Sequence, residues 1–306
     1  ADKDSSVAEY KIDHFSEEQK TIFRNWFVNT ALHDSNTGVR NLSNAHILLA
    51  EDSPSNQAVI KSILRNMNAR VTVANNGQEA IARAHEQHFD IILMDMAMPI
   101  IDGLSATRAI IGESKRNADT PIIALTANAF YEDQQCCRES GMVDFISKPV
   151  DIYEFREKMY YWNSIGDTEE PGTQPPVDLK ETEGAGVFEN RPSEVIDFQI
   201  IKQLEIDTSR EVLPGIIAIY IEETRARIPL MLDSSAAKDW TMLSSEAHKL
   251  KSSSGSFGAV ALQKLALNIE SNIESNDWPT LMDNMKNLEP LAKQSLGELD
   301  DATTYC

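Results

Sequence analysis

The chain has 306 residues and a formal charge of −20, and 42% of its residues are hydrophobic. This length is typical of about two globular domains, because one domain takes roughly 100–200 residues. The excess of acidic side chains excludes a surface built for nucleic acid or for an anionic membrane. No apolar run approaches the roughly 20 residues of a membrane-spanning helix. The three cysteines include no CxxC pair, so they indicate neither a disulfide framework nor a cysteine metal site.

The first 44 residues carry an isolated helical pattern. The apolar side chains Phe15, Ile22, Phe23, Trp26 and Phe27 would share one face of a helix over residues 16–29. Two interpretations of residues 1–44 stay open: a helical connector from an upstream domain, or a tail that docks on the rest of the chain.

Residues 45–163 alternate short apolar runs with amphipathic segments. The apolar runs are His46–Ala50, Arg70–Ala74, Ile91–Met94, Ile122–Leu125 and Phe145–Ile146. The amphipathic segments are Pro54–Met67, Gln78–Gln87, Leu104–Ile111, Phe130–Ser140 and Asp151–Tyr161. Strands that alternate with helices in this way form a parallel sheet covered on both faces. The pattern predicts an α/β domain, doubly wound around a five-stranded parallel sheet.

The segment 164–194 has a different composition. It holds two basic and eight acidic residues, with four prolines, four glycines and few apolar side chains. Such a stretch cannot bury enough surface to offset the entropy of ordering it. We therefore expect a flexible, self-repelling linker between two domains.

Residues 195–300 show only the helical period. Apolar stripes of helical spacing cover 213–228 and 262–273, and a capped helix opens at Asp277. With a further helix around residues 243–257, these stripes predict an all-α domain built as a four-helix bundle. Pro229 lies inside the first of these helices and is expected to kink or end it.

Polar side chains stand at the carboxyl ends of the predicted strands, where a doubly wound sheet places its functional site. They are Glu51, Asp52, Asp95, Thr126 and Lys148. Carboxylates this close repel one another, and Mg²⁺ removes the repulsion because it binds carboxylates together with phosphate oxygens and water. One carboxylate can then attack a phosphoryl group, while the lysine and the hydroxyl stabilise the charge on its oxygens.

The sequences ILLAEDS, DIILMDMAMPIIDG, IIALTA and FISKP resemble the response-regulator receiver domain, which has a flavodoxin-like fold. The resemblance covers essentially all of residues 45–163 and implies that Asp95 is the phosphoacceptor, forming an acyl phosphate. The Mg²⁺ ligands that it implies are Asp52, Asp95, Glu51 and the backbone carbonyl of Ala97. Lys148 would contact the phosphoryl group, Thr126 would move to hydrogen-bond it, and Phe145 would repack when Thr126 moves.

A second group of residues surrounds His248. On a helix, the side chains that would face the core are Leu243, Ala247, Leu250, Ser254 and Phe257. The opposite stripe would carry His248, Lys251, Ser252 and Gly255. A neutral imidazole can attack phosphorus to form a phosphohistidine, and Lys251 would hold the phosphoryl oxygens. Ser252 and Gly255 are small and would let a partner domain approach closely.

The segment AHKLKSSSGSFGA, residues 247–259, resembles the signature of the histidine-phosphotransfer (HPt) domain. The helix layout matches this family over residues 195–300. Ser252 departs from the signature, because the family usually has glycine at this position. The extra hydroxyl would lie on the docking face, where it would slow transfer or narrow the choice of partner.

A receiver domain followed by an HPt domain is similar to the C-terminal part of a hybrid sensor histidine kinase. This resemblance implies a phosphorelay. The upstream donor would be a phosphohistidine on the dimerisation and phosphoacceptor domain of a kinase, and Asp95 would accept its phosphoryl group. Asp95 would pass the group to His248. His248 would then pass it to the receiver of a downstream response regulator. The chain would be the cytoplasmic C-terminal part of a larger kinase, and both a membrane-anchored and an unanchored kinase stay open.

The sequence contains no P-loop and no glycine-rich nucleotide lid, so we expect no ATP-binding kinase domain in it. An alternative function stays open, in which the chain is a non-catalytic interaction scaffold with a degenerate relay. Transfer between Asp95 and His248 within one molecule and transfer between two molecules are equally open at this point.

Overall fold

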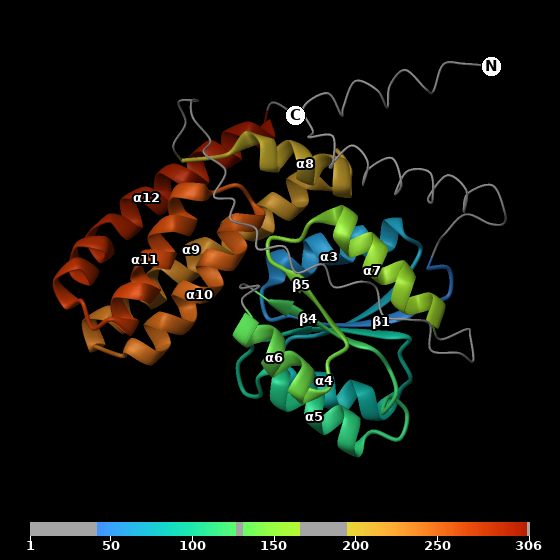
Figure 1. Ribbon diagram of the computed structural model, residues 1–306. Coiled ribbons are helices and arrows are strands. Elements are labelled where there is room, and N and C mark those ends of the chain that lie inside the picture. Colours follow the sequence, from blue (N-terminus) through green and yellow to red (C-terminus); the bar gives the residue numbers. More distant parts are fainter. Residues whose placement is uncertain (1–41, 127–130, 166–194, 305–306) are drawn as a thin grey trace, which may run out of the picture. The chain divides into compact units, whose positions relative to one another are not determined.

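The computed structural model describes residues 42–126, 131–165 and 195–304. The predicted N-terminal helix and nearly all of the predicted linker lie outside the described residues. We call residues 42–165 the sheet region and residues 195–304 the helical region (Figure 1).

The sheet region is built on a five-stranded parallel sheet with the strand order β2-β1-β3-β4-β5. The strands are β1 (His46–Ala50), β2 (Arg70–Ala74), β3 (Ile91–Asp95), β4 (Ile122–Thr126) and β5 (Asp144–Ser147). The strands β1, β3 and β4 are buried along their whole length, as their continuous apolar sequences require. The strand order changes direction between β1 and β3, so the crevice at the carboxyl ends of these two strands is the expected place for a functional site.

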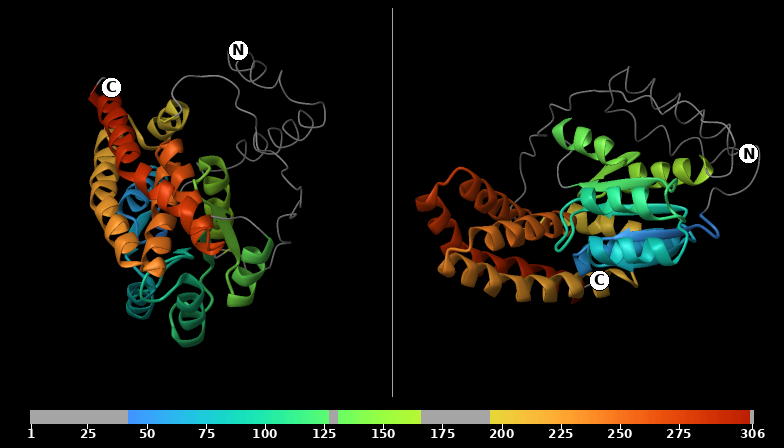
Figure 2. Two further views of the ribbon diagram at one scale, coloured as in Figure 1. Left: turned by 90° about the vertical axis from the view of Figure 1, so that its left-hand side faces the viewer. Right: turned by 90° about the horizontal axis from the view of Figure 1, so that it is seen from below.

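Helices cover both faces of this sheet, as Figures 1 and 2 show. They are α3 (Pro54–Asn66), α4 (Gly77–Glu86), α5 (Gly103–Glu113), α6 (Tyr131–Ser140) and α7 (Ile152–Ile165). Ile60 of α3 and Phe155 of α7 belong to the apolar cluster on one face, while Ala80 of α4 and Ile110 of α5 belong to the cluster on the other. The predicted doubly wound α/β fold is confirmed.

Local sequence determines where α3 and α5 begin. Ser53 caps α3 and Asp102 caps α5, and each side chain accepts a hydrogen bond from a backbone N–H in the first turn of its helix. A Cβ atom at Gly103 would lie 2.2 Å from the carbonyl oxygen of Asp95, so only glycine permits this approach. Both helices therefore start directly beside the carboxyl ends of β1 and β3.

The helical region contains α8 (Phe198–Thr208), α9 (Leu213–Ala237), α10 (Trp240–Ser256), α11 (Val260–Glu274) and α12 (Trp278–Thr304). The helices α9 to α12 pack on one another around an apolar core. Within it, Tyr220 stacks on Phe257 with 4.5 Å between ring centroids, and the Tyr220 hydroxyl is hydrogen-bonded to Ser254 at 2.9 Å. All five side chains predicted to face the core from this part of the chain are buried: Leu243, Ala247, Leu250, Ser254 and Phe257.

Two features of the helical region differ from the expectation. The helix α8 precedes the four predicted helices and packs against α3 and α9. The helix α9 continues through Pro229 to Ala237, so the proline does not end it. Buried Ile228 and Met231 hold the helix on both sides of Pro229, and this packing outweighs the lost backbone hydrogen bond. Among the described helices, none combines the length and the apolar character that crossing a bilayer requires.

The helix α3 contacts both regions. It packs against α8, α9 and α10 as well as against its own sheet. Ile63 of α3, Leu204 of α8 and Ile217 of α9 belong to the same cluster of buried side chains. The hydrophobic core on this face of the sheet therefore continues through α3 into the helical region.

Candidate functional site

The carboxyl ends of three strands and one side of α10 line a single narrow cleft. Its lining includes Glu51, Asp52, Asp95, Lys148 and His248. The sequence predicted the first four at one edge of the sheet and His248 on a separate helical domain. The structure brings both predicted sites to the same cleft.

Lys148 joins two of the three acids. Its Nζ lies 2.7 Å from Asp95 Oδ2 and 2.6 Å from Glu51 Oε2, and none of the three side chains is more than 8% exposed. Burial by itself favours a neutral amine, but the carboxylates of Asp95 and Glu51 outweigh burial and raise the pKa of Lys148. Lys148 is therefore held as an ammonium group against the side chain of Asp95.

The acids form a cluster that favours a cation. One carboxylate oxygen from each of Glu51, Asp52 and Asp95 lies within 4.8 Å of the others. Burial raises the pKa of Glu51 against the opposing effect of Lys148, and it raises the pKa of Asp52 against that of Lys249. Carboxylate oxygens at this spacing suit a hard divalent cation such as Mg²⁺.

The other predicted residues of the sheet region lie around this cluster. Thr126 ends β4 and is buried, and its carbonyl oxygen accepts a hydrogen bond of 2.7 Å from the backbone N–H of Lys148. Phe145 is half-buried on β5, with Lys158 Nζ 4.7 Å from its ring centroid. Ala97 lines the cleft, and its backbone N–H donates to Asp95 Oδ1 at 3.3 Å.

His248 is paired with an acid on the neighbouring helix. Its side chain is 31% exposed, and its Nδ1 lies 2.8 Å from Glu270 Oε1 on α11. Lys251 Nζ lies 2.5 Å from the second oxygen of the same carboxylate. Burial opposes ionisation of Glu270, but the hydrogen bonds from His248 and Lys251 outweigh it and lower the pKa of this carboxyl. An ionised carboxylate only accepts hydrogen bonds, so Nδ1 carries a proton, and in the neutral imidazole the lone pair is then on Nε2.

Ser252 and Gly255, the two residues predicted for the docking face of α10, have different neighbours. Ser252 Oγ accepts a hydrogen bond of 3.4 Å from Asn56 Nδ2 and so contacts the sheet region. Gly255 is buried, and a Cβ atom there would lie 2.5 Å from Gln263 Nε2 on α11. A side chain of the helical region therefore takes up the space beside Gly255, and the role of Gly255 at a docking surface stays a prediction.

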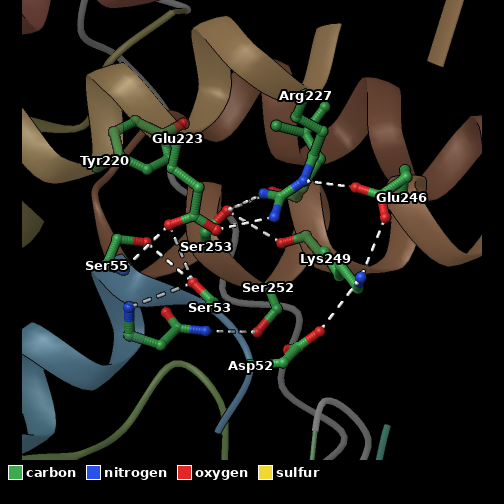
Figure 3. Close-up of polar contacts among 12 residues, drawn as sticks. Asp52, Ser53, Ser55, Tyr220, Glu223, Arg227, Glu246, Lys249, Ser252 and Ser253 are labelled. Carbon is green, nitrogen blue, oxygen red and sulfur yellow. Dashed lines mark hydrogen bonds and ion pairs between the residues drawn. The ribbon is translucent and has the colours of Figure 1, made fainter. Parts of the chain in front are cut away.

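Further polar contacts join α9 and α10 to the end of β1 and the start of α3, as Figure 3 shows. Lys249 Nζ lies 3.2 Å from Asp52 Oδ2. Glu223 Oε2 accepts a hydrogen bond of 3.0 Å from the backbone N–H of Ser55 and one of 3.2 Å from the hydroxyl of Ser53. The helical region therefore contacts both a predicted metal ligand and the N-terminus of α3.

Sequence reasoning missed Glu223, Lys249 and Glu270. Glu270 follows buried Ile269 at the edge of an apolar helical stripe, and an acid at such an edge was the one local signal for it. Lys249 directly follows His248, but nothing in the spacing indicates that its partner is Asp52. The roles of Glu223 and Lys249 depend on contacts between regions that are distant in the sequence.

Comparison with known proteins identifies both regions. Residues 47–160 match the family model of the response regulator receiver domain, and residues 215–302 match that of the Hpt domain. The chain is 28% identical over 243 residues to the aerobic respiration control sensor protein ArcB of Escherichia coli K12, an alignment that covers 78% of this chain and 29% of that protein. It is 36% identical over 146 residues to Histidine kinase 5 of Arabidopsis thaliana, covering 40% of this chain and 16% of that protein. The chain thus spans less than a third of the length of these two relatives.

A solved structure is also similar to part of this chain. It is the receiver domain of sensor histidine kinase PA1611 from Pseudomonas aeruginosa PAO1, with a magnesium ion coordinated in its active site cleft. The two are 41% identical, the match covers 40% of this chain and 99% of that chain, and the TM-score is 0.38.

Proposed function

Because this chain carries a response regulator receiver domain and an Hpt domain, as the hybrid sensor kinases of phosphorelay signalling do, we propose that it is a module that transfers phosphoryl groups between two sites. Asp95 accepts the phosphoryl group and His248 takes it over. The observation that carries this proposal is that Asp95 and His248 line the same cleft of one chain.

The first step on this proposal is the acceptance of a phosphoryl group by Asp95 from a phosphohistidine of an upstream kinase domain. A carboxylate oxygen of Asp95 attacks phosphorus, and the new P–O bond forms as the P–N bond of the donor breaks. Lys148 Nζ, 2.7 Å from Asp95 Oδ2, stabilises the negative charge on the phosphoryl oxygens. Thr126 and Phe145 are the proposed switch residues that respond to this charge.

The acidic cluster fits Mg²⁺. We assign the metal to Asp52, Asp95, Glu51 and the backbone carbonyl of Ala97, all of which line the cleft. Asn56 also lines it, and its buried Oδ1 has no hydrogen-bond partner within the part of the chain that the structure describes. When bound, Mg²⁺ supplies positive charge that offsets the charge on the phosphoryl oxygens.

The second step moves the phosphoryl group to His248. The lone pair of Nε2 attacks phosphorus, the N–P bond forms, and the P–O bond breaks to return the Asp95 carboxylate. The proton stays on Nδ1, where Glu270 accepts its hydrogen bond and offsets the positive charge that the ring gains. Lys251, paired with the same carboxylate, is the proposed contact for the phosphoryl oxygens. The next acceptor is the receiver aspartate of a downstream response regulator.

Phosphate mapping on variants tests this proposal. The full chain is incubated with Mg²⁺ and acetyl phosphate, and the acid-labile phosphohistidine is distinguished from the base-labile acyl phosphate. We expect label at Asp95 and His248 in the wild type, at Asp95 alone in His248→Gln, and at neither residue in Asp95→Asn. His85→Gln is the matched control, because His85 is exposed on α4, and it should label like the wild type.

Two results would contradict the proposed route. Label on His248 in Asp95→Asn would show that the histidine does not depend on Asp95. A wild-type chain that takes no label at either residue would favour the alternative function, a scaffold that holds partners without phosphotransfer.

A further inference from the structure

Lys249 places a positive charge where the proposed metal site has a ligand. Its Nζ lies 3.2 Å from Asp52 Oδ2, and the Asp52 side chain is only 8% exposed. We propose that Lys249 competes with Mg²⁺ for Asp52, so that docking of the Hpt domain on its own receiver and metal binding oppose each other. This inference rests on the proposed function, because it requires the Mg²⁺ site.

The charges of the cleft are nearly balanced in the docked arrangement. Lys148 pairs with Glu51 and Asp95, and Lys249 pairs with Asp52, so two ammonium groups face three carboxylates. A divalent cation bound to Asp52 would add two positive charges beside the ammonium group of Lys249. Like charges repel strongly where water is largely excluded. The metal and Lys249 therefore cannot both bind the Asp52 carboxylate as tightly as either would alone.

Lys249 has a second partner that can hold it after Asp52 is lost. Its Nζ lies 3.0 Å from Glu246 Oε1, one helical turn earlier on α10. Glu246 is fixed in turn by Arg227, whose Nε lies 3.0 Å from the other carboxylate oxygen. Release of Asp52 therefore leaves the ammonium of Lys249 paired, so the exchange avoids the large cost of an unpaired buried charge.

Glu223 makes a second contact between the two domains, and none of the proposed metal ligands takes part in it. It accepts hydrogen bonds from Ser55 and Ser53 at the N-terminus of α3, where the helix dipole favours an anion. Arg227 Nη2 lies 2.8 Å from the other oxygen of Glu223, and both side chains are 8% exposed. Mg²⁺ therefore weakens the docking contact at Lys249 and leaves the contact at Glu223 in place.

The opposition between metal and docking is reciprocal. If the Lys249–Asp52 pair lowers the affinity for Mg²⁺ by some factor, Mg²⁺ must weaken docking by the same factor. Couplings between sites are typically about 5-fold or more. A chain without metal is thus closed by its own lysine, and Mg²⁺ loosens the cleft for an incoming phosphoryl group.

Titration calorimetry with Mg²⁺ alone tests the first half of this inference on the full chain. We expect Lys249→Met to bind Mg²⁺ about 5-fold or more tightly than the wild type. Lys249→Arg keeps the charge and should bind the metal as weakly as the wild type does. Lys293→Met removes an exposed lysine of α12 and should leave the affinity unchanged.

Hydrogen exchange tests the second half at a distance from the metal. Asn66, at the far end of α3, donates hydrogen bonds to the carbonyls of Asp207 and Thr208 in α8. At a rise of 1.5 Å per residue this contact lies about 20 Å from the start of α3, so it reports docking and not metal coordination. Mg²⁺ should speed amide exchange at the end of α8 in the wild type, and it should have little effect in Lys249→Met.

The possible results separate the two proposals. Equal Mg²⁺ affinity in the wild type and Lys249→Met, with both chains still labelled at Asp95, would overturn the competition and leave the proposed function standing. If Mg²⁺ leaves the amide exchange rates in α8 of the wild type unchanged, the competition is overturned as well. A wild-type chain that binds no Mg²⁺ would overturn the metal site and, with it, this inference.

Discussion

In the proposed relay, Glu270 determines which nitrogen of His248 is the nucleophile. A histidine whose surroundings leave both tautomers equal would hold its lone pair on Nε2 only part of the time. Here the ionised carboxylate accepts from Nδ1 at 2.8 Å, which fixes the proton on that nitrogen. The same contact offsets the positive charge that the ring gains when Nε2 attacks phosphorus. On the proposed function Glu270 is thus a positioning residue, because it would act on phosphorus through His248.

Replacement of Glu270 should slow the second transfer and spare the first. Glu270→Gln keeps an acceptor but loses its charge, and hydrogen bonds to charged groups contribute about 1.5–3 kcal/mol. We expect phosphorylation of His248 to slow by about 10- to 100-fold, with labelling of Asp95 unchanged. Glu274→Gln, an exposed position one turn later on α11, is the control. Equal rates in the wild type and Glu270→Gln, measured in a quenched time course, would contradict this role.

Glu270 should also contribute to the loss of stability in acid. Its folded-state pKa is held below the ordinary value of 4.5, so the folded chain favours the ionised form. The stability from this group is therefore fully present above pH 4.5 and is lost as the pH falls through the lower folded-state pKa. As the pH falls below about 4.5, the melting temperature of Glu270→Gln should decline less steeply than that of the wild type. Identical slopes would show that the pairing does not favour the ionised form.

At the level of elements, the sequence is most informative where one local signal suffices. The strands β1 and β2 have the predicted bounds, and the start of α3 is fixed by Ser53 and Pro54, because apolar runs and caps are local. The sequence does not single out α8, because only Ile201 and Leu204 of its five apolar side chains are buried and they form a very short stripe. The sequence placed Gly255 on the correct helix but could not say which neighbour covers it.

The candidate site shows the same limit. Glu51, Asp52, Asp95 and Lys148 were predicted together because the topology of a parallel sheet brings strand ends to one edge. The contacts of Lys249 with Asp52 and of Glu223 with Ser55 join positions 168 or more residues apart in the chain. No periodicity or cap encodes such a contact, because it depends on how the two regions pack.

The apolar side of α10 should dominate the stability of the Hpt domain. Leu250 is fully buried, so Leu250→Ala removes apolar contacts and leaves a cavity. We expect the free energy of unfolding to fall by about 2–5 kcal/mol in urea titrations. Met242→Ala, on the same helix but 49% exposed, should change it by no more than about 0.5 kcal/mol. A similar effect of both substitutions would contradict the assigned faces of α10.

At the scale of the whole molecule, the net charge of −20 has parts with different consequences. The acids of the cleft form the proposed cation site, and Glu223 contacts Ser53 and Ser55 at the start of α3. The proximity of Asp95 and His248 in one chain gives each site a high effective concentration for the other. Tethered sites of this kind reach about millimolar effective concentrations, far above the concentration of a protein in a dilute assay. Transfer within one molecule is therefore expected to outrun transfer between molecules.

Complementation between variants tests this central claim most directly. Asp95→Asn retains only the histidine and His248→Gln retains only the aspartate, so an equimolar mixture can label His248 only between molecules. With Mg²⁺ and acetyl phosphate, we expect the wild type to label His248 at a rate per chain that does not change with protein concentration. At about 1 μM the mixture should be at least about tenfold slower, and its rate should rise with concentration. A mixture that labels His248 as fast as the wild type would contradict transfer within one chain.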